Sequence, residues 1–300
     1  MDLRGCEIPH DIGSILRKQM AEGVSWYQPF IFSDDVVTGA AAVWNAGANK
    51  YLCTEEDPLP VRESFLRETL ILGDWYRHLV DIMVSAFPAA HTFLDFGCNM
   101  GHFGFDLTAR GKQCTGVDVP RNETGKRFLE QIIGIDFEFI SAQYSEELHR
   151  IPDFDDGRQF DVGVFSVVIM HLTDPHYALR YFSKKLRHGM FFSSLLVPGN
   201  VHHFLARMTP YNRDKELPHA FELVPSEPLA ESMLRLSGFG HVYKIPYREG
   251  VDPRHRSRWG CWLAAREPIA EEAISRFGLM YVEDQIDRYA DNAPRPLIAW

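Results

Sequence analysis

Residues 93–107, FLDFGCNMGHFGFDL, join an apolar segment to a glycine-containing loop and then to a segment of helical spacing. Glycine allows tight turns and lets a ligand approach backbone N–H groups, and a helix N-terminus attracts electron-rich groups. Gly97, Gly101 and Gly104 have the spacing G-x-x-x-G-x-x-G. A dinucleotide fold requires G-x-G-x-x-G, and a Walker loop would end in Gly-Lys-Ser/Thr. The stretch therefore indicates a cofactor without a pyrophosphate.

From Thr92 onward, short apolar segments alternate with segments of helical spacing. The predicted strands are 92–97, 113–119, 137–142, 160–169, 189–197, 241–247 and 260–267, and the predicted helices are 103–110, 125–133 and 177–185. Strands that are hydrophobic on both faces and alternate with helices predict a mostly parallel α/β sheet covered by helices. The last two strands could instead form an antiparallel hairpin at the end of that sheet.

The segments before and after this region lack the alternation of strands and helices. Residues 61–87 show helical spacing up to Pro88, so residues 1–90 are predicted to form an N-terminal helical cap. Residues 91–267 form the predicted cofactor-binding domain, with an insertion at 198–228 that covers the substrate. Residues 268–300 are predicted to hold one helix and an irregular tail.

The composition indicates an ordinary globular protein: 300 residues, 45% hydrophobic and 24% charged. A formal net charge of −10 argues against nucleic-acid binding, because binding to phosphates requires an excess of Lys and Arg. Five scattered cysteines suggest reduced thiols, and no apolar run reaches the roughly 20 residues of a membrane span. The expected location is the cytoplasm, without membrane attachment.

A second acid sharpens the cofactor prediction. The segment CTGVDV ends its strand at Asp118, 17 residues after Gly101. A carboxylate at the end of the second strand can accept both hydroxyls of a ribose. An adenosine-containing cofactor without phosphates, bound by these two features, fits S-adenosylmethionine.

These residues resemble class I S-adenosylmethionine-dependent methyltransferases. The first motif of that family, an acid followed by G-x-G-x-G, appears as Asp95-x-Gly97-x-Asn99-x-Gly101, with Asn99 at a variable position. The segments FDVGVFSVVIMHLTDP (160–175) and FELVPSEPLAESMLRLSGFGHVYKI (221–245) extend the resemblance. It implies a Rossmann-like methyltransferase fold with a seven-stranded sheet. S-adenosylmethionine is then the cofactor and S-adenosylhomocysteine the product.

The resemblance also implies cofactor contacts. Gly97 and Gly101 would line the methionine end, Asp118 would hold the ribose, and Ala142 and Gln143 would lie at the adenine. The full set of cofactor-contacting residues is Asp95, Gly97, Asn99, Gly101, Phe103, Asp118, Val119, Ala142, Gln143 and Ser166. Trp26 and Tyr27, in WYQPF, could form an aromatic lid over the sulfonium, or they could lie where the cap packs on the domain.

His171 follows the fourth strand at the edge where ligands bind in open α/β sheets. An imidazole there could remove a proton from the methyl acceptor, or it could only position a loop. The adjacent pair His202-His203 is disfavoured as a metal site because adjacent side chains diverge, and no metal is expected. Tyr211 and Arg213 in the insertion, and the basic group Arg254, His255 and Arg256, are candidate substrate contacts.

The sequence thus predicts a methyltransferase that acts on an O, N or S nucleophile of a small molecule, and it leaves a homodimer open. WYQPFIFSDDVVTG (26–39) and HLTDP (171–175) also resemble the branch that methylates and carboxymethylates tRNA wobble uridines. That tRNA substrate and a catalytically idle binding protein are the alternatives. A nicotinamide oxidoreductase is disfavoured by the glycine spacing.

Overall fold

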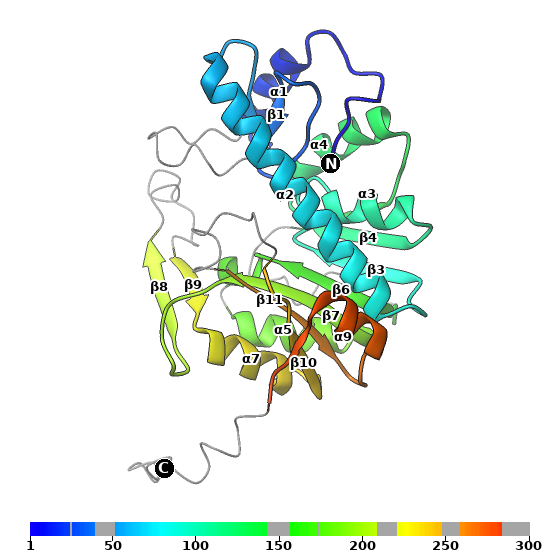
Figure 1. Ribbon diagram of the computed structural model, residues 1–300, viewed down its shortest axis with the longest axis vertical. Helices are drawn as coiled ribbons and strands as arrows, with labels where there is room; N and C mark the ends of the chain where they lie inside the picture. Colours follow the sequence, from blue (N-terminus) through cyan, green and yellow to red (C-terminus); the bar gives the residue numbers. More distant parts are fainter. Residues whose placement is uncertain are drawn as a thin grey trace.

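The computed structural model describes residues 1–24, 26–39, 52–142, 157–172, 174–208, 221–247 and 259–283. Within these ranges an α/β domain carries a cap built from the N-terminal residues (Figure 1). No helix in the described ranges is long and apolar enough to cross a membrane.

A central sheet holds eight strands of the described chain. They are β3 (Thr92–Phe96), β4 (Gln113–Asp118), β5 (Glu138–Ser141), β6 (Phe160–Ser166), β7 (Leu186–Leu195), β10 (His241–Lys244), β11 (Trp259–Ala265) and β12 (Met280–Tyr281). Their order is β12-β10-β11-β7-β6-β3-β4-β5. The strands from β7 to β5 are parallel, whereas β11 is antiparallel to both β7 and β10. The predicted mostly parallel sheet is confirmed, and its last two strands form the antiparallel hairpin.

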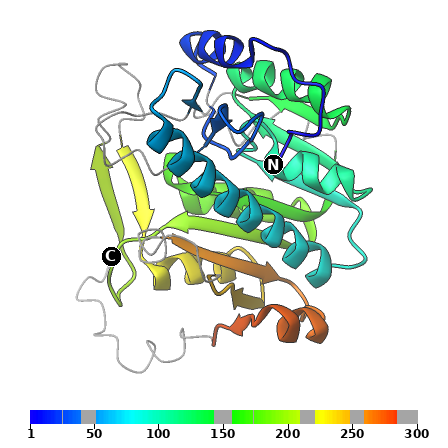
Figure 2. The same cartoon turned by 45° about the horizontal axis from the view of Figure 1, so that its top comes forward.

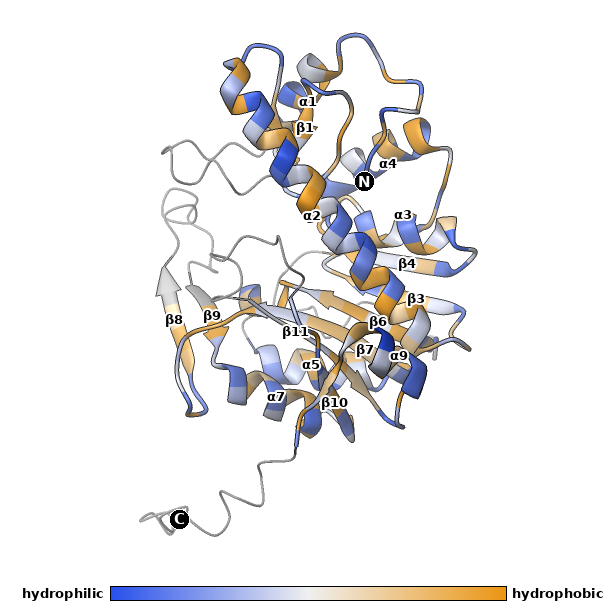
Figure 3. Ribbon diagram, in the orientation of Figure 1, coloured by the Kyte–Doolittle hydropathy of each residue, from blue (hydrophilic) through white to orange (hydrophobic). Residues whose placement is uncertain are grey.

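Helices cover both faces of this sheet (Figure 2). One face carries α2 (Leu59–Ala86), α3 (His102–Ala109), α4 (Pro120–Ile133) and α9 (Glu271–Phe277), and the other carries α5 (Pro175–Ser183) and α7 (Glu227–Leu236). Side chains alternate along β3, so that Phe93 enters the core on the α2 side while Leu94 and Phe96 enter the core on the α5 side. Figure 3 shows the resulting apolar colouring along the strands of the sheet.

A carboxylate holds the start of β3 beside the start of β6. Asp161 accepts hydrogen bonds from the backbone N–H groups of His91 and Thr92 at 2.8 and 3.0 Å, and its own N–H donates to the Thr92 hydroxyl at 2.9 Å. Arg187 adds a contact at 3.1 Å. This cluster fixes the start of β3 against the start of β6 at the centre of the sheet.

The cap contains α1 (Ile12–Ala21) and the short antiparallel pair β1 (Val37–Thr38) and β2 (Leu52–Cys53). The helix α2 begins in the cap and continues across the sheet (Figures 1 and 2). Its second half buries Trp75, Leu79 and Met83 in the same core as Phe93. The second half of α2 is therefore part of the helical layer of the sheet, although it lies within the residues predicted to form the cap.

Strands also form where the sequence pattern indicated only an insertion. β8 (Phe204–Met208) and β9 (Phe221–Pro225) pair antiparallel in a sheet of their own. At its base, the N–H of Ser226 donates to the carbonyl of His203 at 2.9 Å and closes the hairpin. The N–H of Val197, just after β7, donates to the carbonyl of Pro225 at 3.0 Å and joins the hairpin to the end of β7. The hairpin also contacts the short 3₁₀ helix η4 (Ile169–His171) that follows β6. It therefore stands beside the end of β6 where His171 lies.

Candidate active site

The chain order of the sheet changes direction at β3. Strands β4 and β5 extend to one side of β3, and β6 and β7 extend to the other. Ligands of open α/β sheets bind at the carboxyl ends of the strands at such a switch point. The glycine loop after β3, Asp118 at the end of β4 and Ser166 at the end of β6 all lie at this edge.

The glycine loop adopts a left-handed backbone at three positions, with φ of 75° at Gly97, 53° at Asn99 and 88° at Gly101. Asparagine is among the residues that tolerate this region best, which explains how Asn99 replaces a glycine. The loop is tied to β4 because the N–H groups of Gly97 and Cys98 both donate to the carbonyl of Val117, at 2.8 and 3.2 Å.

Two of the three glycines make room for a side chain of the protein. A Cβ atom at Gly101 or Gly104 would collide with the ring of Phe137, and a Cβ at Gly116 would collide with both that ring and Cys98. Phe137 precedes β5 and is buried. Gly101 and Gly104 thus have a packing role that the sequence did not reveal, while Gly97 remains partly exposed at the edge of the sheet.

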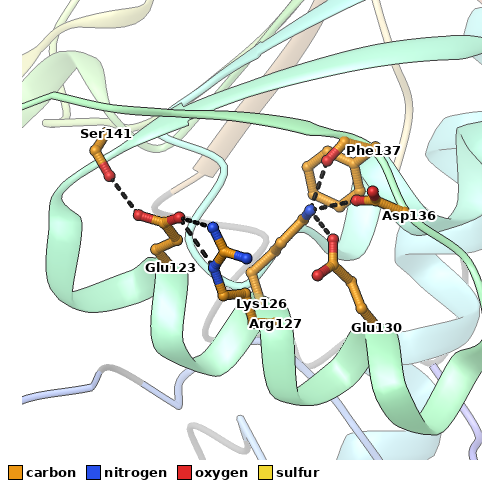
Figure 4. Close-up of polar contacts among 7 residues, drawn as sticks. All are labelled: Glu123, Lys126, Arg127, Glu130, Asp136, Phe137 and Ser141. Atoms are coloured by element: carbon orange, nitrogen blue, oxygen red, sulfur yellow. Dashed lines mark hydrogen bonds and ion pairs between the residues drawn. The ribbon is translucent and has the colours of Figure 1, made fainter.

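A buried lysine holds Phe137 in place (Figure 4). The ammonium group of Lys126 on α4 donates to the carbonyl of Phe137 at 2.5 Å and lies 4.5 Å from the centroid of its ring. Glu130 and Asp136 pair with the same ammonium group. Burial of a lysine without such partners would be costly. The ammonium group of Lys126, its two carboxylate partners and the carbonyl of Phe137 therefore act together to fix the ring beneath the loop.

Asp118 joins the loop to the end of β4. Its carboxylate accepts hydrogen bonds at 2.7 Å from the backbone N–H groups of Asn99 and Val119 and from the side-chain amide of Asn122. Asp118 as a whole residue is 4% exposed. Its contact with a ribose stays a prediction, and the structure adds that Asp118 also holds the loop.

The end of β3 and the loop after it contain buried polar atoms without a partner. Within the described residues, Oδ2 of Asp95 and both amide atoms of Asn99 are buried without a hydrogen-bond partner. Burial raises the pKa of Asp95 well above its ordinary value, and the nearby charge of Asp118 raises it further. Buried polar atoms of a native protein are normally satisfied. A ligand with an ammonium and a carboxylate, such as the methionine end of S-adenosylmethionine, has the groups that these atoms lack.

A row of small polar side chains runs from the loop towards β11. Ser166 on β6 pairs in register with Ser193 on β7, and Ser193 pairs with Cys261 on β11. The two serine hydroxyls lie 3.1 Å apart. Tyr76 of α2 lies against the start of α3, with its ring centroid 4.8 Å from that of His102. Burial raises the pKa of its hydroxyl, and the charge of Asp95 and then the thiol of Cys261 raise it further.

The segment HLTDP combines structural residues with His171. Leu172 is buried, Asp174 accepts a hydrogen bond from the N–H of Tyr177 at 2.9 Å, and Pro175 is the first residue of α5. These are a core contact, an N-cap and a proline at N1. His171 is exposed at the end of η4, and it stays the candidate base. Val167, before η4, has φ of 58°, which is rare for a β-branched residue and typical of functional sites.

Two predicted cofactor contacts lie in the core. The ring of Phe103 stacks on Tyr76 at 4.9 Å and is 1% exposed. Trp26 is wholly buried, with its ring edge-to-face with Phe30, Phe32 and Phe128. Both rings therefore have packing roles, and their contacts with the cofactor stay predictions. Tyr27 is 47% exposed and its contact with the cofactor stays a prediction.

Other predicted positions are placed as follows. Ala142 donates its N–H to the carbonyl of Asp118 at 2.7 Å, and so lies beside the end of β4. His202 contacts the hydroxyl of Ser232, whereas His203 contacts the carbonyl of Val201. Six of the predicted site residues lie outside the described residues: Gln143, Tyr211, Arg213, Arg254, His255 and Arg256.

The structure adds two residues to the site that the sequence did not single out. Tyr76 lies in a helical segment whose apolar neighbours dominated the pattern. Gln28 lies inside the quoted motif WYQPF, but only its aromatic neighbours suggested a function. Its amide contacts the carbonyl of Cys98 and the N–H of His102, on either side of the glycine turn.

Comparison with known proteins agrees with this architecture. A model of a family described as "Methyltransferase domain" matches residues 71–239, more than half of the chain. The chain therefore belongs to this family. With the fold and the glycine loop of the class I enzymes, it is a methyltransferase whose methyl donor is S-adenosylmethionine. The search of curated proteins gave no match.

Several solved structures are similar to the chain. The N-terminal domain of EvdMO1 with SAH bound is 14% identical, with 64% of this chain and 81% of that chain covered and a TM-score of 0.49. Magnesium protoporphyrin IX methyltransferase (ChlM) from Synechocystis PCC 6803 with bound SAM is 13% identical, with 70% and 86% covered and a TM-score of 0.45. The [4+2]-cyclase SpnF is 12% identical, with 69% and 83% covered and a TM-score of 0.47.

Proposed function

We propose that the protein transfers a methyl group from S-adenosylmethionine to an O, N or S nucleophile of a small molecule. The observation that carries the proposal is the polar row of Ser166, Ser193 and Cys261, which leads from the glycine loop along the carboxyl edge of the sheet. The β8–β9 hairpin stands beside this edge, where β9 contacts η4 and β7.

The chain contributes binding, alignment and a base to this reaction. When bound, S-adenosylmethionine supplies a methyl group that its sulfonium makes electrophilic. Asp118 would hold the ribose, while Asp95 and Asn99 would hold the polar groups of the methionine end. Fixing the two reactants in line lowers the barrier because their relative freedom is already lost on binding. If the acceptor carries a proton, His171 is the residue that would remove it.

The chemistry of the described edge favours a small acceptor over a nucleic acid. The residues that the described strands place at this edge are neutral or acidic: Asp95, Ser166, Ser193 and Cys261. A tRNA substrate, as in the wobble-uridine branch, would require cationic groups against its phosphates. The formal net charge of −10 favours a small acceptor as well. A cytoplasmic location and a homodimer remain part of the proposal.

The test is a labelling experiment in two arms. The protein is incubated with methyl-labelled S-adenosylmethionine and either a metabolite extract or bulk tRNA, and labelled products are identified by mass. A labelled small molecule supports the proposal, whereas label confined to tRNA would establish the alternative. Binding of S-adenosylhomocysteine with no labelled product in either arm would favour an idle binding protein.

A variant of His171 tests the proposed base. His171→Ala should lower kcat on the identified acceptor by about 100-fold or more, which is the usual contribution of a general base. The affinity for S-adenosylhomocysteine should change less than about twofold, because the variant leaves the loop and Asp118 intact. Full activity of the variant would remove His171 from this role.

A further inference from the structure

We infer that Gln28 is a positioning residue that sets the conformation of the cofactor loop from the N-terminal cap. This inference rests on the proposed function of that loop. Gln28 occupies the middle of WYQPF, the motif first considered as an aromatic lid. Trp26 of that motif lies in the core, whereas the amide of Gln28 contacts the cofactor loop.

The side chain of Gln28 joins the two sides of the glycine turn. Its Nε2 donates to the carbonyl of Cys98 at 3.0 Å, and its Oε1 accepts from the N–H of His102 at 3.1 Å. The same carbonyl accepts the N–H of Gly101 at 2.8 Å. One amide thus holds both ends of the turn that contains Asn99.

The loop requires this partner because it cannot supply one itself. The first N–H groups of a helix have no partner within the helix and are normally satisfied by the side chain of the N-cap residue. The N-cap residue of α3 is Gly101, which has no side chain, and it cannot acquire one because Phe137 fills the adjacent space. Gln28 replaces the missing cap from a position 74 residues away in the sequence.

The cap holds Gln28 rigidly. The hydroxyl of Thr38 donates to the carbonyl of Gln28 at 2.8 Å and accepts the N–H of Phe30 at 3.2 Å. Gly39 has φ of 81°, and a Cβ there would collide with the backbone of Gln28. The side chain of Gln28 is itself 6% exposed. A buried, fixed amide of this kind makes its hydrogen bonds in one geometry only, and the loop adopts that geometry.

Two variants separate positioning from general stability. Gln28→Met keeps the size of the side chain and removes both hydrogen bonds. Gln19→Met is the matched control, because it makes the same substitution in α1 of the same cap, where Oε1 of Gln19 has no partner among the described residues. Amide hydrogen exchange of residues 98–104 in the free protein should be about tenfold faster or more in Gln28→Met. It should be unchanged in Gln19→Met.

Ligand affinities then show whether the loop serves the methionine end. Calorimetry compares S-adenosylhomocysteine with 5′-methylthioadenosine, which keeps the adenosine and lacks the amino acid. In Gln28→Met the Kd of S-adenosylhomocysteine should rise about tenfold or more, the scale of one or two lost hydrogen bonds. The Kd of 5′-methylthioadenosine should change less than about twofold.

The outcomes are distinct. Unchanged exchange in Gln28→Met, or an equal loss of affinity for both ligands, overturns the inference. If the wild-type protein binds neither ligand, the proposed function fails, and the exchange comparison alone decides whether Gln28 sets the loop. A loss for S-adenosylhomocysteine alone, together with faster exchange, supports it.

Discussion

The packing of Gly104 against Phe137 gives the sharpest prediction for the loop. A Cβ atom added at Gly104 would lie 2.7 Å from Cζ and 2.9 Å from Cε1 and Cε2 of the Phe137 ring. Carbon atoms in good contact are about 3.5–4.0 Å apart. The ring cannot move aside freely, because Lys126 holds one of its faces and Phe105 lies edge-to-face at 5.0 Å.

The effect of Gly104→Ala should therefore depend on Phe137. In the wild-type background, overpacking costs about 1–3 kcal/mol, and the better helix propensity of alanine returns about 1 kcal/mol. The free energy of unfolding should fall by up to about 2 kcal/mol. Phe137→Ala alone should cost about 3–5 kcal/mol. In that background Gly104→Ala meets no ring and should stabilise the protein by about 1 kcal/mol.

A double-mutant cycle measures this dependence by urea unfolding of the four proteins. The coupling free energy between the two sites should be about 1–3 kcal/mol, with Gly104→Ala changing sign between backgrounds. Phe137→Leu offers a milder background, because leucine also lacks the ring atoms that the new methyl would meet. Equal effects of Gly104→Ala in all backgrounds would refute the packing role.

Two further predictions concern buried carboxyl groups. Burial raises the pKa of Asp161, but hydrogen bonds from His91, Thr92 and Arg187 outweigh it and bring the pKa to about 2. Asp161 should thus contribute about 2 kcal/mol that is fully present above about pH 4 and lost as the pH falls through about 2. Urea unfolding of wild type and Asp161→Asn should show their difference shrinking in acid, and a constant difference would contradict it. The raised pKa of Asp95 predicts that S-adenosylhomocysteine releases a proton on binding, because its ammonium favours the ionised carboxylate. Affinity should then rise with pH over the range where Asp95 titrates; calorimetry in buffers of different ionisation heat should detect the proton, and Asp95→Asn should abolish it.

The central sheet could be predicted because its strands are buried on both faces and read as continuous apolar segments. The helix α4 begins at Pro120, five residues before the predicted start at Gly125, because proline is favoured at the first helical position. The strands β8 and β9 were not predicted, since FLARM and FELVP are short and mix apolar with charged residues. β12 adds an eighth strand of only two residues, which carries no periodic signal.

The site could be predicted only where a residue type at a given position indicates a particular chemistry. An acid at the end of β4 indicates a ribose contact and glycines after β3 indicate a ligand-binding turn, and the structure places both at the same edge of the sheet. Gln28 and Phe137 have none, because glutamine and phenylalanine acquire their roles from partners that are far away in the sequence. The aromatic residues of WYQPF were more conspicuous than Gln28, although it is the amide of Gln28 that contacts the loop.

These contacts together show that the cofactor loop is not an autonomous motif. Asp118 holds it at Asn99 from β4, Gln28 holds it at Cys98 and His102 from the cap, and the ring of Phe137 supports it from the start of β5. The three supports come from separate parts of the chain. The cofactor loop is therefore fully held only when the cap has docked and the parallel strands have paired. A loop fixed in this way loses little freedom when a ligand binds. Cap docking and cofactor binding must therefore be thermodynamically coupled, because a ligand that binds the ordered loop also stabilises the docked cap.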